Sequence, residues 1–432
     1  MKTEFLLSRR KFINSMSLAS GGLLTPTFLY EALEKDNFDA LKDFDASKDQ
    51  TENEAYWKKV KTYFDVSNDI INLNNGGVSP SPITVMEAVT KYNKLANKIP
   101  SFNLYRVLDK GRGPLKIRLA ELAGCLPEEI AINRNATEAL ETVIFGLTLK
   151  AGDEIVLAKQ DYPSVKNAWL QREKRDGIVL KWLDLKLPSE DKQYLVNEYE
   201  NAFSEKTKIV QITHMINWNG QILPAKEIAA AAKAVGAEVI LDAAHSFAQI
   251  PFKFSDLNID YAGVSLHKWL SAPFGTGFLY VAKDKIKALY PLFGAPEDQT
   301  DTIKKFEHLG TRSFPIEQSI NDAIDFHLTI GTKRKNDRLY HLKKHWTKKL
   351  AKIDSIEILT PKSKEFSGGI ALFSMKGYDK PELLNLLLNK YKIHATMVNM
   401  GNLQGIRISP NVYTLKSEID KFIYAIEDLQ KV

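Results

Sequence analysis

Short apolar runs alternate with amphipathic segments in the middle of this chain, between residues 129 and 265. Six of the runs have the length of β-strands, and helical patterns lie between several of them. Residues 137–149 form one such helical pattern, and residues 225–235 form another, alanine-rich one that Pro224 opens at a position helices favour. This alternation predicts a mostly parallel sheet with helices on both faces. The predicted strands are residues 129–133, 155–158, 178–183, 209–213, 239–241 and 261–265.

The last hundred residues differ from the middle of the chain, because long helices separate only two apolar runs. This pattern predicts a smaller α+β domain. We expect a large domain over residues 75–330 and a small domain over residues 331–432, with residues 54–74 packing on the small domain. The elements expected in the small domain are a basic helix at residues 333–352, a strand at 369–374, a helix from Pro381, a strand at 405–409 and a helix from Ser417.

The composition is that of a globular protein with substantial cores. The chain has 432 residues, of which 44% are hydrophobic and 26% charged, so disorder, collagen and small disulfide scaffolds are excluded. Its single cysteine, Cys125, rules out an intrachain disulfide and a cysteine-rich metal site, and we predict no metal site. The net charge is +6; residues 1–30 contribute +3 and residues 331–352 contribute +8, so the rest carries −5. This distribution does not indicate a nucleic-acid-binding protein.

The first thirty residues are expected to be a targeting signal. Ser8, the pair Arg9 and Arg10, and Phe12 precede a mildly apolar stretch that two glycines and a proline interrupt. This pattern is similar to a twin-arginine export signal, followed by a polar linker over residues 31–53. The stretch is too short to span a bilayer, which takes about 20 apolar residues. We therefore expect an exported protein without an integral membrane segment in its mature chain, or a cytoplasmic one if the signal does not function.

Two strand ends carry residues that together indicate an aldehyde cofactor. Lys268 follows the strand at residues 261–265, and a lysine at a buried strand end is costly unless its charge is removed or used. A Schiff base with an aldehyde does both, although a lone lysine is more often a surface residue. Asp242 ends the preceding strand, where it would pair with a protonated pyridine nitrogen or simply cap a helix. The pair is more informative than either residue alone, and together with the two turns described next it points to pyridoxal 5'-phosphate (PLP).

Two further turns fit the same cofactor. Ala136 and Thr137 open the helix after the first strand, where backbone N–H groups and a hydroxyl make a phosphate site. The same turn also reads as a capping box, with Asn135 as the cap and Glu138 three residues later. Asn217 follows the strand at residues 209–213 and could donate a hydrogen bond to a ring oxygen, or belong to an ordinary polar turn.

With these four turns in order, the chain resembles the class V aminotransferase family of PLP-dependent enzymes, and in particular its isopenicillin-N-epimerase-like members. Residues 74–80 and 406–410 are also similar to motifs that open and close this family's sequences. The resemblance implies the α/β PLP-dependent transferase fold, with a large domain built on a mostly parallel sheet and a smaller α+β C-terminal domain. It also implies PLP as cofactor, a small amino-acid substrate, and a homodimer with shared active sites.

The resemblance assigns roles residue by residue. Lys268 would form the Schiff base, Asp242 would pair with the pyridine nitrogen, and His245 and Asn217 would contact the ring's 3-oxygen. Arg407 would hold the substrate carboxylate, near Asn75 and Gly76 of the opening motif. Tyr162, Arg407 and His245 also have ordinary structural interpretations as a core cap, an ion-pair partner and a buried histidine. The remaining cofactor-binding assignments are Ala136, Thr137, Ser265 and His267 on the phosphate, Tyr162 stacked on the ring, and Thr311 reaching the phosphate of the neighbouring subunit.

We expect an aminotransferase in which the amine of Lys268 removes the α-proton of an amino acid. The alternatives are an amino-acid or peptide epimerase, a β-eliminating lyase and a cofactor-free binding protein with the same fold. Epimerisation needs a second acid–base group opposite Lys268, which spacing does not identify. A cysteine desulfurase would need a thiol shortly before the substrate arginine, whereas Cys125 precedes the phosphate turn. The basic helix at residues 333–352 is expected to be solvated rather than to bind a partner or an anionic surface.

Overall fold

The computed structural model describes residues 38, 41, 44 and 49–430. The predicted signal at residues 1–30 and most of the predicted linker lie outside the described residues. The account below concerns the compact unit Ala40–Val432. No helix among the described residues is long and apolar enough to cross a membrane.

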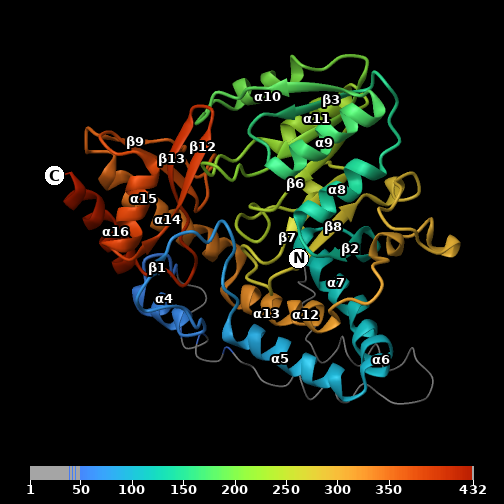
Figure 1. Cartoon of the computed structure of the whole chain (residues 1–432), viewed down its shortest axis with the longest axis horizontal. Coiled ribbons are helices and arrows are strands. Elements are labelled where there is room, and N and C mark those ends of the chain that lie inside the picture. Colours follow the sequence, from blue (N-terminus) through green and yellow to red (C-terminus); the bar gives the residue numbers. More distant parts are fainter. Residues whose placement is uncertain (1–37, 39–40, 42–43, 45–48, 431–432) are drawn as a thin grey trace, which may run out of the picture. The chain divides into compact units, whose positions relative to one another are not determined.

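A seven-stranded sheet forms the centre of the larger part of the fold (Figure 1). Its strand order is β2-β8-β7-β6-β5-β3-β4, and β8 alone runs antiparallel to its neighbours. The strands are almost entirely buried, which matches the continuous apolar runs of the sequence. Their bounds are β2 Ile130–Asn133, β3 Glu154–Ala158, β4 Val179–Leu183, β5 Thr207–Thr213, β6 Glu238–Asp242, β7 Tyr261–Ser265 and β8 Gly277–Val281.

All six strands predicted for this sheet are present, and β7 has the predicted bounds. Strand β8 was not predicted. Its five residues follow a glycine- and proline-containing turn, and an apolar run of that length does not distinguish a strand from other buried structure. It pairs with β2 on one side and β7 on the other, and so completes the sheet.

Helices cover both faces of this sheet, as the alternating pattern predicts. One hydrophobic cluster joins the strands to α8 and α9, and a second joins their opposite faces to α7, α10, α11 and α13. Glycines end two of these helices in the left-handed conformation that favours this residue, Gly124 after α7 and Gly177 after α9. The helices of this part are α5 Ile83–Lys98, α6 Pro100–Phe102, α7 Arg112–Ala123, α8 Ala136–Gly146, α9 Pro163–Asp176, α10 Lys192–Glu200, α11 Ala225–Ala234, α12 Phe314–Gln318 and α13 Ile320–Ile330.

The C-terminal part contains a four-stranded antiparallel sheet of order β12-β13-β10-β9, packed with three helices around a third hydrophobic cluster (Figure 1). Strands β10 and β13 and all three helices were predicted, whereas the short strands β9, β11 and β12 were not. A two-stranded parallel pair, β1 with β11, joins this part to the N-terminal segment. The bounds are β1 Ile71–Asn72, β9 Ile356–Ile358, β10 Ala371–Met375, β11 Ile393–His394, β12 Thr396–Met400, β13 Leu403–Ile408, α14 Thr332–Leu350, α15 Lys380–Asn389 and α16 Lys416–Leu429.

Helix α4 (Glu54–Lys61) contacts the same C-terminal helices. Glu54 Oε1 lies 2.6 Å from Nη1 of Arg338 on α14, and Lys61 Nζ lies 2.8 Å from Oε1 of Glu418 on α16. Asn53 caps the helix with its side-chain oxygen. The residue boundaries expected for the two domains remain predictions.

The prediction of a solvated basic helix is wrong for three residues of α14. Lys335, Arg338 and Lys343 are buried, while Lys344 is exposed. Each buried cation has polar or aromatic partners that replace water: Arg338 lies 5.1 Å from the ring centroid of Trp57, and Lys343 Nζ donates to Pro361 O at 3.1 Å and to Ser367 Oγ at 2.6 Å. Helical spacing identified the apolar face, but it cannot identify the loops that cover the positions beside it.

Candidate active site

The carboxyl ends of β6 and β7 bring the main candidate residues together. Asp242 is the last residue of β6, Ser265 is the last residue of β7, and Lys268 follows in the turn after β7. The strands are parallel neighbours, with Asp242 paired to Gly263. In open α/β sheets this edge is where ligands bind, so the position of the cluster agrees with a functional site.

The amine of Lys268 is held between a histidine and an aromatic ring. Its Nζ atom lies 2.9 Å from Nε2 of His245 and 5.9 Å from the ring centroid of Tyr162. Burial lowers the pKa of Lys268 to about 8, an effect that the Asp242 carboxylate opposes and the Arg407 charge reinforces. About a tenth of the amine is therefore uncharged at pH 7, far more than for an ordinary lysine, and the uncharged amine is the form that attacks an aldehyde.

Asp242 is a buried carboxyl group whose Oδ1 accepts a hydrogen bond from the N–H of Ala244 at 2.9 Å. Burial raises its pKa, and the Ala244 N–H group and the Lys268 charge act in the opposite direction. A cation placed against this carboxyl would recover the lost solvation. That requirement fits the protonated pyridine nitrogen of PLP.

His245 lies between the lysine and a tryptophan. Its Nδ1 accepts a hydrogen bond from the indole Nε1–H of Trp269 at 3.4 Å, while its Nε2 faces Lys268. Burial, followed by the charges of Lys268, Arg407 and His267, lowers the pKa of His245 well below its usual value. The imidazole is therefore neutral near neutral pH.

The expected phosphate turn is built at the start of α8. The N–H of Ala136 donates to Ser265 Oγ at 3.0 Å, and Asn135 caps the helix by accepting from the N–H of Glu138. The Glu138 carboxylate accepts from the N–H of Arg134 instead of from that of the cap residue, so the predicted capping box forms only in part. A Cβ atom on Gly277 would lie 2.6 Å from the Cα of Asn135, so only glycine allows β8 to approach this turn.

Thr137 and His267, the other two residues expected near the phosphate, are both half-buried. The Nδ1 atom of His267 lies 3.2 Å from the carbonyl oxygen of Thr276, which orients the ring. Burial, with the Lys268 charge as a second cause, lowers the pKa of His267. A bound phosphate would favour the charged imidazole.

Arg407 of β13 occupies the other end of the site. Its Nη1 donates to the carbonyl oxygen of Asn217 at 2.8 Å and its Nη2 to Asn74 Oδ1 at 2.9 Å. Its Nε and the Oδ1 of Asn217 are buried and have no hydrogen-bond partner among the described residues. Burial lowers the pKa of Arg407 to about 10. A substrate carboxylate would satisfy the unpaired donor and the buried charge.

Two predicted residues have other contacts. The side chain of Asn75 donates to the carbonyl oxygens of Asn72 and Ser409 and accepts from the hydroxyl of Tyr413 at 2.6 Å, so it holds the segment in place. Thr311 Oγ1 lies 2.9 Å from the hydroxyl of Tyr105 on an exposed surface. A role for Thr311 in the site of a second subunit remains a prediction.

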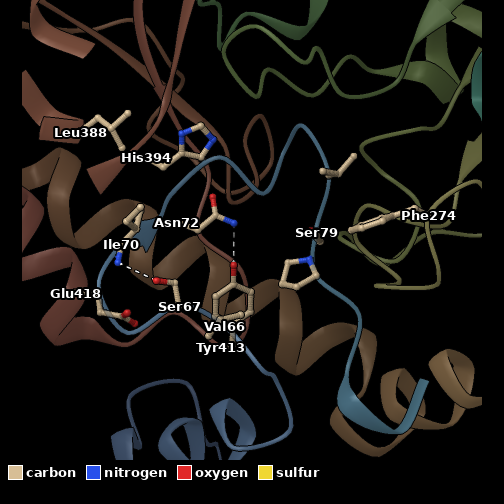
Figure 2. Close-up of a pocket in the computed structure, with 12 residues that line it drawn as sticks. Val66, Ser67, Ile70, Asn72, Ser79, Phe274, Leu388, His394, Tyr413 and Glu418 are labelled. Carbon is tan, nitrogen blue, oxygen red and sulfur yellow. Dashed lines mark hydrogen bonds between the residues drawn. The ribbon is translucent and has the colours of Figure 1, made fainter. Parts of the chain in front are cut away.

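A cavity of about 440 Å³ lies beside the site, between the segment of residues 66–80 and the C-terminal part (Figure 2). Asn72 points into this region and donates to the hydroxyl of Tyr413 at 3.1 Å. Ser79, at the other end of the cavity, donates its N–H to the carbonyl oxygen of His267. The cavity therefore borders the cofactor turn, but its lining residues do not include the predicted catalytic groups.

Sequence reasoning missed three contributors to this site. Asn74 accepts a hydrogen bond from Arg407, and Trp269 donates one to His245. Asp161 lies in the turn after β3, where its Oδ1 accepts from the hydroxyl of Thr213 at 2.6 Å and its Oδ2 from the N–H of Ala158 at 3.0 Å. The sequence shows Trp269 and Asp161 only as neighbours of Lys268 and Tyr162, and a position next to a functional residue does not reveal which way a side chain points.

The described residues fit PLP. A helix N-terminus and Ser265 form one end of the site. Its middle holds the Lys268 amine, whose pKa is lowered, and the buried Asp242 carboxyl. Its other end holds the Arg407 guanidinium and an Asn217 amide oxygen that has no hydrogen-bond partner among the described residues. The fold and these donors together define a PLP-dependent α/β enzyme.

The chain belongs to the class V aminotransferase family, because the family described as Aminotransferase class-V matches residues 71–422. It is 29% identical over 393 residues to isopenicillin N epimerase of Streptomyces clavuligerus, covering 87% of this chain and 98% of that protein. It is 27% identical to a probable cysteine desulfurase of Synechocystis sp., covering 85% and 94%. A solved mutant of C-DES, with glycine covalently linked to its PLP cofactor, has the same fold with a TM-score of 0.77, at 21% identity and 85% and 99% coverage.

The predicted family and fold class are thereby confirmed. The similar proteins include epimerases, desulfurases and a lyase, so they support the alternatives to the expected aminotransferase better than the aminotransferase itself. The roles expected for individual site residues, the dimer and the export signal remain predictions.

Proposed function

We propose that this chain is a PLP-dependent epimerase of an amino acid or a peptide, with Lys268 and Tyr162 as its two acid–base groups. One observation carries the proposal: the Lys268 amine faces the Tyr162 ring, with Nζ 5.9 Å from the centroid. A flat cofactor ring in van der Waals contact with Tyr162, at roughly 3.5 Å, would lie between them. Lysine would then be on one face of the ring and tyrosine on the other.

The phenol group of Tyr162 is close enough to Arg407 to affect it. Burial lowers the pKa of Arg407, and the Tyr162 phenol is the group that opposes this effect. If Arg407 holds the substrate carboxylate, the phenol lies near the adjacent α-carbon. Inversion requires that a proton leave one face of this carbon and return to the other, so this pair of groups supports epimerisation. Bound PLP would supply the electron sink that makes the α C–H acidic.

The state of Cys125 argues against persulfide chemistry, although cysteine desulfurases are among the similar proteins. Its side chain packs against the core cluster of the large sheet. Burial raises the pKa of Cys125 to about 12, and the nearby Glu129 carboxylate adds to the shift. The thiolate, which is the nucleophile of a desulfurase, is therefore scarce at neutral pH.

Exchange in deuterated water tests the proposal. The purified holoenzyme is incubated with a panel of L- and D-amino acids and short peptides, and α-deuterium incorporation, inversion, oxo-acid release and sulfide release are measured separately. We expect inversion with deuterium incorporation and no oxo acid. Release of oxo acid with conversion of the cofactor to its amine form would instead identify an aminotransferase, and release of sulfide a lyase.

Two variants test whether Lys268 and Tyr162 are the two acid–base groups. Lys268→Ala should abolish exchange and inversion together. Tyr162→Phe keeps the aromatic ring but removes the hydroxyl, so it should retain deuterium exchange while inversion falls by about 100-fold. Equal losses of exchange and inversion in Tyr162→Phe would remove Tyr162 from the mechanism.

We also propose that the enzyme is a homodimer in which Thr311 completes the neighbouring site. Hybrid dimers of a Lys268→Ala chain and a Thr311→Ala chain contain one site with both residues intact. They should regain cofactor affinity and turnover that both parent dimers lack. Monomeric behaviour in solution, or hybrids no better than the parents, would contradict this assembly.

Export through the twin-arginine pathway is a further proposal, supported by the residue pattern of the first thirty positions. A reporter fused to residues 1–40 should leave the cytoplasm, and replacing Arg9 and Arg10 with lysines should retain it there. If the reporter stays in the cytoplasm with the native residues as well as with the lysine variant, residues 1–40 are not an export signal.

A further inference from the structure

Trp269 is a fully buried residue in the turn that carries Lys268. Its indole Nε1 lies 3.4 Å from Nδ1 of His245, and the two rings make an edge contact with centroids 6.5 Å apart. Its carbonyl oxygen accepts a hydrogen bond from Nζ of Lys335, at 2.5 Å. The indole is thus fixed on its backbone side by α14 and on its ring side by the imidazole.

An indole N–H donates hydrogen bonds and accepts none, so the atom that it contacts must offer a lone pair. In His245 that atom is Nδ1. A neutral imidazole carries one proton, which then resides on Nε2. Nε2 lies 2.9 Å from Nζ of Lys268, so its N–H can donate only to an uncharged lysine amine.

We propose that Trp269 is a positioning residue that holds His245 in the Nε2–H form and thereby favours the uncharged, nucleophilic amine of Lys268. The inference rests on the proposed function for the role of that amine, but the tautomer itself is a property of this chain alone. If the indole N–H is lost, His245 is free to carry its proton on Nδ1. Nε2 then accepts from the lysine ammonium group and stabilises the charged form.

Other charged or titratable groups also face this pair. Asp242 on β6 favours the charged lysine, Arg407 on β13 disfavours it, and His267 on the same turn acts on His245. Tyr162, the residue that precedes α9, faces the lysine with its ring. All four groups remain when Trp269 is replaced by phenylalanine, so a change in the titration of Lys268 can be attributed to the indole N–H.

The test begins with the apoprotein labelled with [15N]histidine, in which ring nitrogen shifts distinguish the two tautomers. The His245 signals are identified by their absence in His245→Gln. We expect the Nε2–H form in the wild type at pH 9, above the pKa of Lys268, and a mixture with the Nδ1–H form in Trp269→Phe. An Nδ1–H tautomer in the wild type at this pH would overturn the proposal whether or not the variant folds.

The second measurement is the pH dependence of the rate at which the apoprotein binds PLP covalently. In Trp269→Phe the midpoint should rise by about half to one pH unit, as expected for the loss of one hydrogen bond to the neutral amine. An unchanged midpoint with an unchanged tautomer would reject the proposal. Trp346→Phe is the matched control, because its buried indole N–H has no hydrogen-bond partner among the described residues and its removal should change neither measurement.

The proposed function and the proposed role of Trp269 can be refuted independently of each other. Absence of covalent PLP binding in the wild type would refute the proposed function and leave the tautomer measurement intact. Normal PLP binding with no effect of Trp269→Phe on the His245 tautomer would refute only the role of Trp269.

Discussion

The backbone of Gly76 lies directly against the guanidinium group of Arg407. A Cβ atom added to Gly76 would be 3.4 Å from Arg407 Cζ and 3.2 Å from Ser409 Oγ, and the N–H of Gly76 donates to that hydroxyl at 2.9 Å. Asn74, two residues earlier, accepts from Arg407 Nη2. One short segment near the start of the large part therefore fixes an arginine that lies more than 300 residues later in the chain.

Replacing Gly76 by alanine should weaken substrate binding. The new methyl group would meet Ser409 Oγ at 3.2 Å, so the hydroxyl that accepts from the Gly76 N–H must shift by a few tenths of an ångström and carry the segment beside Arg407 with it. We expect the KM for the amino-acid substrate to rise by a few fold with a smaller change in kcat. Steady-state kinetics measures this directly. Gly77→Ala is the matched control, because its Cβ would meet its nearest neighbour, Asn74 O, at an ordinary 3.4 Å. Equal KM values for Gly76→Ala and the wild type would argue against Arg407 as the carboxylate ligand.

Replacing Cys125 by alanine should leave turnover within about twofold of the wild type, because the partly buried thiol packs against the core and its raised pKa keeps it protonated. A modest loss of thermal stability is expected from the smaller side chain, on the order of 1 kcal/mol. Turnover is measured with whichever substrate the exchange experiment identifies. If Cys125→Ala loses more than tenfold of its activity while its circular dichroism spectrum stays native, Cys125 takes part in the reaction.

Hydrophobic periodicity and the order of the motifs predicted much of the large sheet and the position of its site. The sheet strands from β2 to β7 were predicted, because buried parallel strands are continuous apolar runs, and Lys268 and Asp242 could be placed at adjacent strand ends. What the sequence does not contain is side-chain direction across distant segments. The contact of Trp269 with His245 depends on how two loops close over each other, and the pairing of Asn74 with Arg407 depends on how the two parts of the chain meet.

The burial of Lys335 should make stability depend on pH. Burial lowers its pKa to about 7, whereas an unfolded lysine keeps its ordinary value near 10.5. Between these values the unfolded chain binds more protons, so this residue's contribution to stability increases as pH rises from 7 and is lost as pH falls through 7. Lys335→Met should remove a slope of up to about 1.4 kcal/mol per pH unit.

Urea unfolding at pH 7, 8 and 9 compares Lys335→Met with the wild type. The free energy of unfolding of the wild type should increase with pH relative to that of Lys335→Met. Lys344→Met, which removes an exposed lysine of the same helix, serves as the control and should follow the wild type. A difference that is constant across these pH values would show that Lys335 titrates as it does in the unfolded chain.

Asp161 should produce the opposite slope. Burial raises the pKa of its carboxyl group to about 7 from an ordinary value of 3.8, against the hydrogen bonds from Thr213 and Ala158. The folded protein therefore keeps this proton between pH 4 and 7 while the unfolded chain loses it, so the contribution of Asp161 to stability is full below pH 4 and is lost as pH rises through 7. Asp161→Asn can keep both contacts without titrating, because its amide oxygen can accept from the Ala158 N–H while its amide nitrogen donates to the Thr213 hydroxyl. Its stability relative to the wild type should increase from pH 5 to pH 7, by up to about 1.4 kcal/mol per pH unit, and stay level above that. Urea unfolding across this range, with the exposed Asp298→Asn as control, checks the sign, because a carboxylate held ionised by its hydrogen bonds would be ionised in both states and would leave the difference between Asp161→Asn and the wild type constant from pH 5 to pH 7.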